Sequence, residues 1–321
     1  MTKRQLHRSC AVLLILFDFH LLAQQAANDD PRPVNVNAVA ILRWYKANLS
    51  TSFPVGKQPW GAAFDGANIW TANYLSNTVT KMRAHDGKEL GNFKVGTAPI
   101  ALAFDGANIW VTNNLSRTVT KLRASDGAAL GEFTVGNNPI GVVFDGSFVW
   151  VVNSGDAEVV KLRANDGTIV GRFQLPTISA GVAFDGCNIW VANSGGTTVT
   201  KLRASDGSNL GQFSVGANPQ DVAFDGTNVW VTNALSNTVT KLRASDGANL
   251  GNFNVALSPL GLAFDGENIW VAGQEGAVTK LRANDGSILG TFALGGSPNG
   301  VAFDGANIWV TNNATNTVSK M

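Results

Sequence analysis

The chain has 321 residues and a formal net charge of +1, because 24 basic side chains nearly balance 23 acidic ones. The basic residues recur along the chain instead of gathering in one patch, so nothing indicates binding to nucleic acid or to an anionic membrane surface. One cysteine, Cys10, lies in the N-terminal segment described next, which leaves Cys187 alone and excludes an internal disulfide in the mature chain.

Residues 1–27 have the pattern of a secretory signal peptide. Basic residues precede an apolar run at 11–17, and small residues suited to cleavage follow it, at Ala23, Ala26 and Ala27. The run is too short for a membrane span, and no later segment reaches ~20 apolar residues. We therefore predict an extracytoplasmic protein, periplasmic or secreted, without a membrane span. Residues 28–41 are expected to form a linker or one short helix that begins at Asn37.

A Phe-Asp-Gly phrase dominates the rest of the chain. It recurs at intervals of 40 residues, and of 39 in the last step, beginning at Phe64, Phe104, Phe144, Phe184, Phe224, Phe264 and Phe303. A fixed period between about 20 and 50 residues is the signature of a repeat architecture.

Each repeat contains four short runs rich in Val, Phe, Trp, Thr and Leu. Two of the gaps between these runs contain an Asp-Gly pair, such as Asp225-Gly226 and Asp246-Gly247. This pair favours a turn, because Asp bonds its own backbone and Gly accepts a positive φ. No window shows a sustained helical period. Four strands in about 40 residues are typical of a propeller blade, so we predict an all-β, seven-bladed β-propeller of four-stranded antiparallel blades over residues 42–321.

The sequence also predicts how the ring closes. Phe53 and Val55 fall 40 residues before Phe93 and Val95, so the N-terminal segment has the pattern of a fourth strand without the first three. The chain ends directly after the third strand of the seventh copy. We expect the N-terminal strand to complete the last blade and thereby protect its sheet edge.

The stretch Ile-Trp-Val-Thr-Asn at residues 109–113 resembles the signature of YVTN-type β-propellers. The wider group includes NHL-like repeats and the streptogramin-lyase-like (virginiamycin B lyase-like) propellers, and the resemblance covers about residues 42–321. It implies a seven-bladed propeller. It also implies a metal-assisted lyase or lactone hydrolase, of the streptogramin-lyase-like or gluconolactonase type, as one functional alternative.

Positions that repeat in every copy are expected to build the ring. Trp70 and its equivalents share one place in the second strand, where a large ring can fill the wedge between neighbouring sheets. We interpret the Asp of each Phe-Asp-Gly as a turn former rather than a catalytic acid. Lys81, Arg83 and their equivalents are interpreted as a solvated balance to the repeated aspartates.

Function is expected where the repeat breaks, at the channel mouth formed by the loops before the first strand and after the second strand. The position just after the loop Pro varies widely among the copies. The next position is Gly or Ala in every copy except one, where Asp221 places an acid at the channel lip. The predicted ligand-binding residues are Trp60, Tyr74, Asp156, Glu158, Gln220, Asp221, Gln274 and Glu275. A polar collar around the channel is predicted from Asn73, Asn113, Asn153, Asn193, Asn233 and Asn312.

Both predictions have a structural alternative. Solvent-facing loop positions drift freely, and Asn at a strand end commonly satisfies backbone groups of a turn.

Three function classes follow. The first is a monomeric binding or interaction scaffold whose channel mouth takes a small polar ligand, a glycan or a peptide. The second is the lyase or lactone hydrolase, and the third is a structural surface protein without a small ligand. The related lyases resemble one another in using a His base near a metal, whereas His85 lies in a turn away from the mouth. Binding is therefore favoured over catalysis, and no catalytic residue is assigned.

No cofactor is predicted. A Ca²⁺ or Mg²⁺ ion becomes the exception if the carboxylates of Asp156, Glu158, Asp221 or Glu275 converge.

Overall fold

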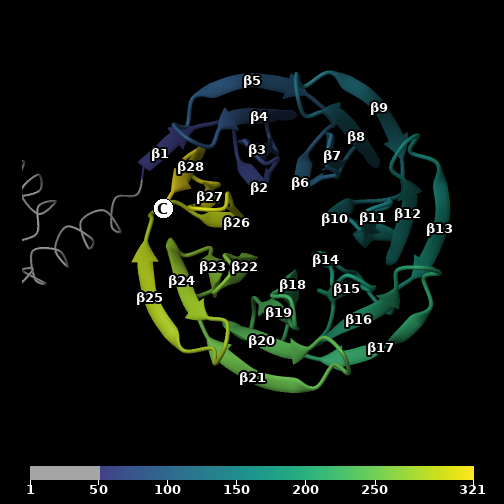
Figure 1. Cartoon of the computed structure of the whole chain (residues 1–321), viewed down its shortest axis with the longest axis vertical. Helices are drawn as coiled ribbons and strands as arrows, with labels where there is room; N and C mark the ends of the chain where they lie inside the picture. Colours follow the sequence, from purple (N-terminus) through teal and green to yellow (C-terminus); the bar gives the residue numbers. More distant parts are fainter. Residues whose placement is uncertain (1–50) are drawn as a thin grey trace, which may run out of the picture. The chain divides into compact units, whose positions relative to one another are not determined.

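The structure is a computed structural model, and it describes residues 51–321. This range forms seven four-stranded antiparallel sheets, which stand as blades around a common centre (Figure 1). The predicted all-β, seven-bladed propeller is therefore confirmed. The predicted signal peptide at 1–27, the linker or short helix at 28–41 and the first residues of the predicted propeller domain lie outside the described residues.

The first strand of each blade lies nearest the centre, as Figure 1 shows for β2, β6 and β10. Blade 1 consists of β2 (Pro59–Phe64), β3 (Asn68–Asn73), β4 (Thr78–Arg83) and β5 (Glu89–Lys94). Blade 2 consists of β6 (Pro99–Phe104), β7 (Asn108–Asn113), β8 (Thr118–Arg123) and β9 (Ala129–Thr134). Blade 3 consists of β10 (Pro139–Phe144), β11 (Phe148–Asn153), the 3₁₀ turn η1 (Ser154–Asp156), β12 (Glu158–Arg163) and β13 (Ile169–Gln174).

The remaining blades repeat this order. Blade 4 consists of β14 (Val182–Phe184), β15 (Asn188–Asn193), β16 (Thr198–Arg203) and β17 (Asn209–Ser214). Blade 5 consists of β18 (Pro219–Phe224), β19 (Asn228–Asn233), β20 (Thr238–Arg243) and β21 (Asn249–Asn254). Blade 6 consists of β22 (Pro259–Phe264), β23 (Asn268–Gly273), β24 (Ala277–Arg282) and β25 (Ile288–Ala293). Blade 7 consists of β26 (Pro298–Phe303), β27 (Ile308–Asn312), β28 (Thr317–Lys320) and β1 (Thr51–Pro54).

Blade 7 joins the two ends of the described chain. Strand β1 pairs antiparallel with β28, with Phe53 opposite Val318, so the predicted closure is confirmed. The ring of Phe53 stacks on Trp309 at a centroid distance of 5.6 Å, which repeats the contact between Phe93 and Trp70 in blade 1, at 5.5 Å. The N-terminal strand therefore supplies both the hydrogen bonds and the aromatic ring that the fourth strand supplies in the other blades.

The Asp of each Phe-Asp-Gly forms the turn between the first two strands. Asp65 Oδ1 accepts hydrogen bonds from the backbone N–H of Ala67 at 2.9 Å and of Asn68 at 2.6 Å, and its Oδ2 accepts the indole N–H of Trp70 at 2.7 Å. Gly66 completes the turn with a φ of 95°, which a side chain rarely adopts. The predicted turn role is confirmed, and the carboxylate also orients the buried tryptophan.

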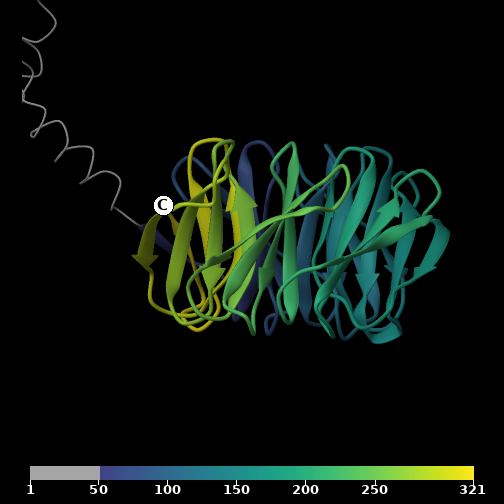
Figure 2. The ribbon, with the colours of Figure 1, turned by 90° about the horizontal axis from the view of Figure 1, so that it is seen from below.

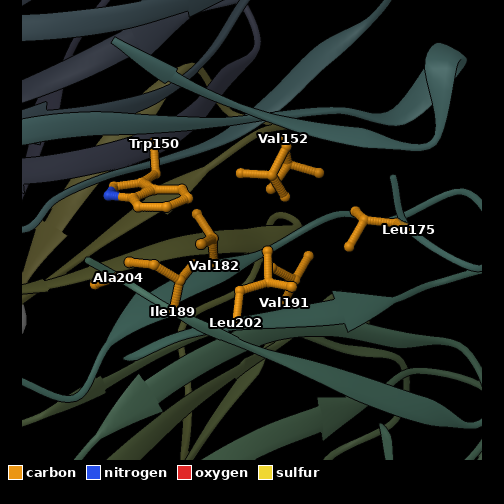
Figure 3. Close-up of a cluster of buried hydrophobic side chains, with 9 residues drawn as sticks. Trp150, Val152, Leu175, Val182, Ile189, Val191, Leu202 and Ala204 are labelled. Atoms are coloured by element: carbon orange, nitrogen blue, oxygen red, sulfur yellow. The ribbon is translucent and has the colours of Figure 1, made fainter. Parts of the chain in front are cut away.

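The repeated tryptophans fill the space between neighbouring blades, as predicted. Trp150 of blade 3 is fully buried among Val182, Ile189 and Leu202 of blade 4, and Figure 3 shows these side chains packed together. Equivalent clusters join the other pairs of neighbouring blades. Because such a cluster belongs to two blades at once, apolar burial stabilises the ring rather than any blade alone.

Five of the seven repeated lysines are buried and the other two, Lys280 and Lys320, are half-buried, which corrects the prediction of a solvated position. Lys81 has 6% of its surface exposed, and its Nζ donates to the carbonyls of Ala124 at 2.6 Å and Ser125 at 3.0 Å in blade 2. The same Nζ lies 5.1 Å from the ring centroid of Trp70. The repeated arginines do stay exposed, and Arg123 pairs with an aspartate three residues later at 2.9 Å. On the third strand of a blade, the lysine therefore bonds the neighbouring blade, whereas the arginine two residues later stays at the surface.

Figure 2 shows the blades from the side, with their strands running between two faces of the ring. We call the face with the loops before the first strand and after the second strand the mouth face. These two loops bond each other in blade 1, where Tyr74 N–H donates to the carbonyl of Gln58 at 3.0 Å. The Asp-Gly turns lie at the opposite ends of the same strands.

Candidate functional site

The first strands of all seven blades surround a central cavity of about 200 Å³, which we call the channel cavity. Near the mouth face it is lined by the second and third residues of these strands, and in blade 4, where β14 begins later, by the equivalent Ala180 and Gly181. The variable position contributes Trp60, Ile100, Ile140, Ala180, Gln220, Leu260 and Asn299. The cavity therefore collects the position at which the seven copies differ most.

A β-bulge brings these residues to the cavity. In blade 5, Pro219 pairs with Asn233 and Val222 pairs with Val231, so Gln220 and Asp221 together face one residue of the neighbouring strand. That residue is Thr232, whose Oγ1 accepts the backbone N–H of Asp221 at 2.9 Å. Bulges re-aim side chains next to functional sites, and here the same irregularity recurs in blades 1, 2, 3, 6 and 7.

Close approach of neighbouring blades explains the glycine that follows the variable position. A Cβ at Gly61 would stand 2.5 Å from the carbonyl oxygen of Ile100, and a Cβ at Gly261 would stand 2.3 Å from that of Asn299. Real Cβ atoms do not come so close to backbone atoms, so the spacing of the first strands favours glycine here. Ala101 and Asp221 are the two copies with a side chain at this position, and Asp221 is the polar one, which makes it the most informative departure from the repeat.

Asp221 lies inside the channel rather than on a solvent-exposed lip. Its Oδ1 accepts the backbone N–H of Val222 at 2.9 Å, and its Oδ2 accepts that of Leu262 in blade 6 at 3.2 Å. The residue is half-buried, with its accessible surface in the narrow cavity, and the neighbouring blades desolvate the carboxylate. Burial therefore raises the pKa of Asp221 to about 6, against the smaller opposing effect of the two N–H donors.

The polar side chains occupy one part of the cavity wall. Trp60 of blade 1 and Asn299 of blade 7 are neighbours in the ring, and Gln220 and Asp221 stand in blade 5. The buried Nε1 of Trp60 and Nδ2 of Asn299 have no hydrogen-bond partner within residues 51–321. Buried donors without partners are rare in native proteins and often mark a place for a water, an ion or a ligand.

Three predicted ligand-binding residues line the cavity, namely Trp60, Gln220 and Asp221. Tyr74 lies behind one of them, with its ring centroid 5.8 Å from that of Trp60. Gln220 donates from Nε2 to Asn218 Oδ1 at 2.8 Å, so a loop of the mouth face holds its amide. The structure therefore brings together half of the predicted set.

The other four predicted residues lie outside the cavity lining. Asp156 accepts two hydrogen bonds from Asn137, both at 2.6 Å, and these bonds from the backbone and side chain lower the pKa of Asp156. Glu158 is buried and pairs with Arg172 at 2.5 Å. Gln274 and Glu275 are exposed in the loop after β23.

The six asparagines of the predicted collar are buried inside the blades and do not line the channel cavity. Asn73 Nδ2 donates to Thr78 Oγ1 at 3.1 Å and to Thr80 Oγ1 at 2.8 Å. Asn153 departs from this pattern, because its Nδ2 bonds Glu158 Oε1 at 3.1 Å. A carboxylate thus replaces a threonine in blade 3, and the asparagines join the second and third strands instead of facing the channel.

The carboxylates considered for a metal do not gather. Within residues 51–321, no group of three His, Cys, Asp or Glu side chains has an arrangement that could hold a metal ion. His85 lies in the turn between β4 and β5, away from the mouth face, where its carbonyl accepts the Nζ of Lys320 at 3.0 Å. None of the helices in this described part of the chain is both long and apolar enough to cross a membrane.

One polar residue of the cavity wall was not among the predicted ligand-binding residues. Asn299 occupies the variable position in blade 7 and is only 6% exposed. The sequence does distinguish Asn299, because its polar amide stands where four other copies carry an aliphatic side chain. The sequence could not show that its Nδ2 is buried without a partner.

Comparisons with solved structures place the fold among propellers of diverse activity. A hydrazine synthase of Kuenenia stuttgartiensis superposes with a TM-score of 0.74 at 19% identity, covering 82% of this chain and 95% of that chain. A streptogramin B lyase superposes with a TM-score of 0.71 at 18% identity, covering 85% of this chain and 96% of that chain. The resemblance to streptogramin-lyase-like propellers is thus confirmed for the fold. In all, 1721 chains match, so the fold alone selects no function.

Sequence comparison gives the family. Among curated proteins, no sequence matches the chain significantly. The family model described as "Outer membrane protein assembly factor BamB" matches residues 62–288, which is more than half of the chain and reaches from blade 1 into blade 6. The chain therefore belongs to the family of the outer membrane protein assembly factor BamB.

Proposed function

We propose that this protein is an extracytoplasmic binding scaffold that takes a small polar ligand in its channel cavity. The family description, which names an assembly factor of the outer membrane, supports a location outside the cytoplasm. The signal-peptide pattern of residues 1–27 supports the same location. The rigid ring of blades provides the scaffold, and the variable position provides the specificity.

One observation carries the proposal. Trp60 and Asn299, each with a buried donor that has no partner within residues 51–321, and Asp221, a desolvated carboxylate, are residues that line a single cavity. An unpaired buried donor costs about 1 to 3 kcal/mol, and the carboxylate of Asp221 has two N–H donors but no cation beside it to offset its desolvation. A ligand that supplies an acceptor and a donor would remove that cost, and concave sites with a few convergent polar groups are typical ligand sites.

The size of the cavity limits the ligand. Drug-sized ligands occupy pockets of roughly 300 to 1,000 Å³, whereas this cavity measures about 200 Å³. The ligand is therefore a molecule of few heavy atoms, or one group of a larger glycan or peptide that lies over the mouth face.

The lyase or lactone hydrolase alternative receives less support. Asp156 and Glu158 are bound by Asn137 and Arg172, and Asp221 stands apart from both in the channel. An isolated carboxylate can act as a general base, so Asp221 is the residue on which this alternative depends. Ring opening of a lactone by the purified protein, lost in Asp221→Asn, would decide in its favour.

A thermal-shift screen tests the binding proposal. The purified protein is melted with small amines, alcohols, amides, sugars, lactones and divalent cations, because a ligand that binds only the folded state raises the melting temperature. The expected result is a hit whose shift is reduced in Asn299→Ala and in Asp221→Asn. Glu275→Gln, which changes an exposed acid on the same face, serves as the control and should keep the full shift. Hits that none of the cavity variants affects would favour a surface site, and the absence of any hit would favour the structural alternative.

A further inference from the structure

The charges around the channel cavity are unbalanced. Asp221 is the only ionisable side chain among the residues that line it, and no Lys, Arg or His of residues 51–321 belongs to that lining. Each carboxylate oxygen of Asp221 accepts one backbone N–H, from Val222 or from Leu262. A carboxylate oxygen has a second lone pair, so both oxygens can accept a further hydrogen bond. The wall therefore offers a desolvated carboxylate without a cationic partner.

The wall next to this charge is apolar. Blades 2, 3 and 4 contribute Ile100, Ile140 and Ala180, and blade 4 adjoins the blade that carries Asp221. Gly181 keeps the approach from blade 4 free of a side chain, because a Cβ there would stand 2.6 Å from Asp221 Oδ1. Farther round the ring, Trp60 presents an aromatic side chain backed by Tyr74. The cavity thus combines a carboxylate, an aliphatic arc and an aromatic ring.

This combination selects among classes of ligand. An anion would face Asp221 without a positive group to balance it. A Ca²⁺ ion takes six to eight oxygen ligands, yet Asp221 is the single carboxylate among the residues that line the cavity, and most of the other lining side chains are apolar. A sugar needs a polar partner for most of its hydroxyls, and the aliphatic arc has none. An ammonium group suits both the carboxylate and the aromatic ring.

We propose that the channel cavity binds a small monovalent organic ammonium ion, whose head bonds Asp221 and whose short apolar chain packs against Ile100, Ile140 and Ala180. The inference rests on the proposed function, which it makes specific for one ligand class. The raised pKa of Asp221 agrees with it, because burial without a cation disfavours the charged form and a bound ammonium ion would favour it.

The test compares ligands of one size on the wild-type protein. n-Butylammonium chloride, sodium butanoate and 1-butanol have the same chain length and differ in charge, so dissociation constants from ligand-observed NMR isolate the effect of the head group. The expected order is n-butylammonium at least tenfold tighter than 1-butanol, with no binding of butanoate. Calcium chloride is included to compare an inorganic cation.

The pH dependence gives an independent result. Asp221 is the one titratable group that faces the cavity within the described chain, and its pKa of about 6 means that it releases its proton between pH 5 and pH 7.5. A simple amine stays protonated over that range, since a lysine-like amine has a pKa near 10. Binding of n-butylammonium should therefore strengthen about tenfold from pH 5 to pH 7.5. In Asp221→Asn it should be at least tenfold weaker and independent of pH, whereas Glu275→Gln should behave as the wild type.

The outcomes separate the inference from the proposed function. Equal binding of 1-butanol and n-butylammonium, tighter binding of calcium, or unchanged binding in Asp221→Asn would each overturn the ammonium ligand. If a neutral ligand binds instead and Asn299→Ala weakens it, the channel remains a binding site and only the ligand class is wrong. If the wild type binds no probe and the wider screen gives no hit, both proposals fail.

Discussion

Gly181 in blade 4 leaves open the space that the side chain of Asp221 in blade 5 occupies. A Cβ at Gly181 would stand 2.5 Å from the Cα of Asp221 and 2.6 Å from its Oδ1. The backbones meet at the same point, where Gly181 N–H donates to the carbonyl of Gln220 at 2.7 Å. The acid and the glycine therefore form one unit across a blade boundary, although they are 40 residues apart in the sequence.

This contact predicts coupling between the two positions. Gly181→Ala should destabilise the protein, because the new methyl group meets both the backbone and the carboxylate of blade 5. In an Asp221→Gly background the clash with the carboxylate disappears, so the same change should cost about 0.5 to 3 kcal/mol less, the usual coupling between residues in contact. Urea unfolding of the four proteins gives the coupling energy. Gly141→Ala, whose Cβ meets Ala180 of the next blade, is the control and should show no coupling to Asp221.

A second prediction concerns the tryptophans between the blades. Trp190→Ala should lower the free energy of unfolding by ~3 to 5 kcal/mol, because it opens a cavity in the interface between blades 4 and 5. Trp190→Phe keeps most of the ring but leaves Asp185 without the indole N–H that it now accepts at 2.7 Å. We expect a smaller loss of about 1 to 3 kcal/mol for Trp190→Phe. Equal losses in the two variants would show that the hydrogen bond, and not packing, is the main contribution.

The buried lysines give a third prediction with a control two residues away. Lys161 Nζ donates to the carbonyl of Ala204 at 2.7 Å and lies 4.8 Å from the ring centroid of Trp150. Lys161→Met should cost about 1 to 3 kcal/mol, because it leaves a buried carbonyl without its partner. Arg163→Met breaks only the exposed pair with Asp166 and should cost less than about 1 kcal/mol. Chemical denaturation of both variants decides, and a larger loss in Arg163→Met would contradict this role for the lysine.

Sequence reasoning succeeded where each position repeats. Seven copies of Trp70, Asp65 and the Asp-Gly turns reveal the period, the number of blades and the missing strand of blade 7, because the same packing problem recurs at every boundary. The burial of Lys81 was not predicted. Its acceptors are backbone carbonyls of the next blade, and carbonyls leave no mark on the sequence.

The candidate site could be predicted only in part, for a similar reason. Asp221 stands out because it replaces Gly or Ala, and Gln220 because it is a polar residue at a variable position, and both line the cavity. Glu158 breaks the pattern equally clearly, but its partner Arg172 appears in the same blade and compensates for it inside the structure. A break in a repeat therefore indicates either a ligand contact or a compensated core change, and only the three-dimensional neighbours distinguish the two.

Ring closure gives the fourth prediction. Deletion of residues 1–55 removes β1, which pairs with β28, and the side chain of Phe53, which stacks on Trp309. We expect this truncation to lose cooperative folding, because one sheet edge and one core cluster become exposed. Deletion of residues 1–50 keeps β1 and is the control, which should melt as one cooperative transition. An unchanged melting curve after the longer deletion would show that the ring does not depend on this strand.

The last prediction concerns pH and follows from the raised pKa of Asp221, about 6 against an ordinary value of 3.8. Below about pH 4 the carboxyl group is protonated in both the folded and the unfolded chain, so it contributes no pH dependence. Between about pH 4 and pH 6 the unfolded chain releases the proton while the folded chain retains it, so this group lowers stability as pH rises. Above about pH 6 the loss is complete, at about 2 kcal/mol when the remaining solvent access is taken into account.

Turn aspartates with a lowered pKa act in the opposite direction, so their contribution to stability must be subtracted; these are Asp105, Asp185, Asp265 and Asp304. For Asp105, burial would raise the pKa, but the hydrogen bonds from Trp110, Ala107 and Asn108 outweigh it and lower the pKa. Such groups lose stability as pH falls, which hides the effect of Asp221 in the wild type alone. The free-energy difference between wild type and Asp221→Ala cancels them, since both proteins contain the same turns. The free energy of unfolding of the wild type, relative to that of Asp221→Ala, should fall by about 2 kcal/mol as pH rises from 4 to 7. A difference that stays constant across this range would mean that Asp221 is ionised in the folded protein as readily as in water.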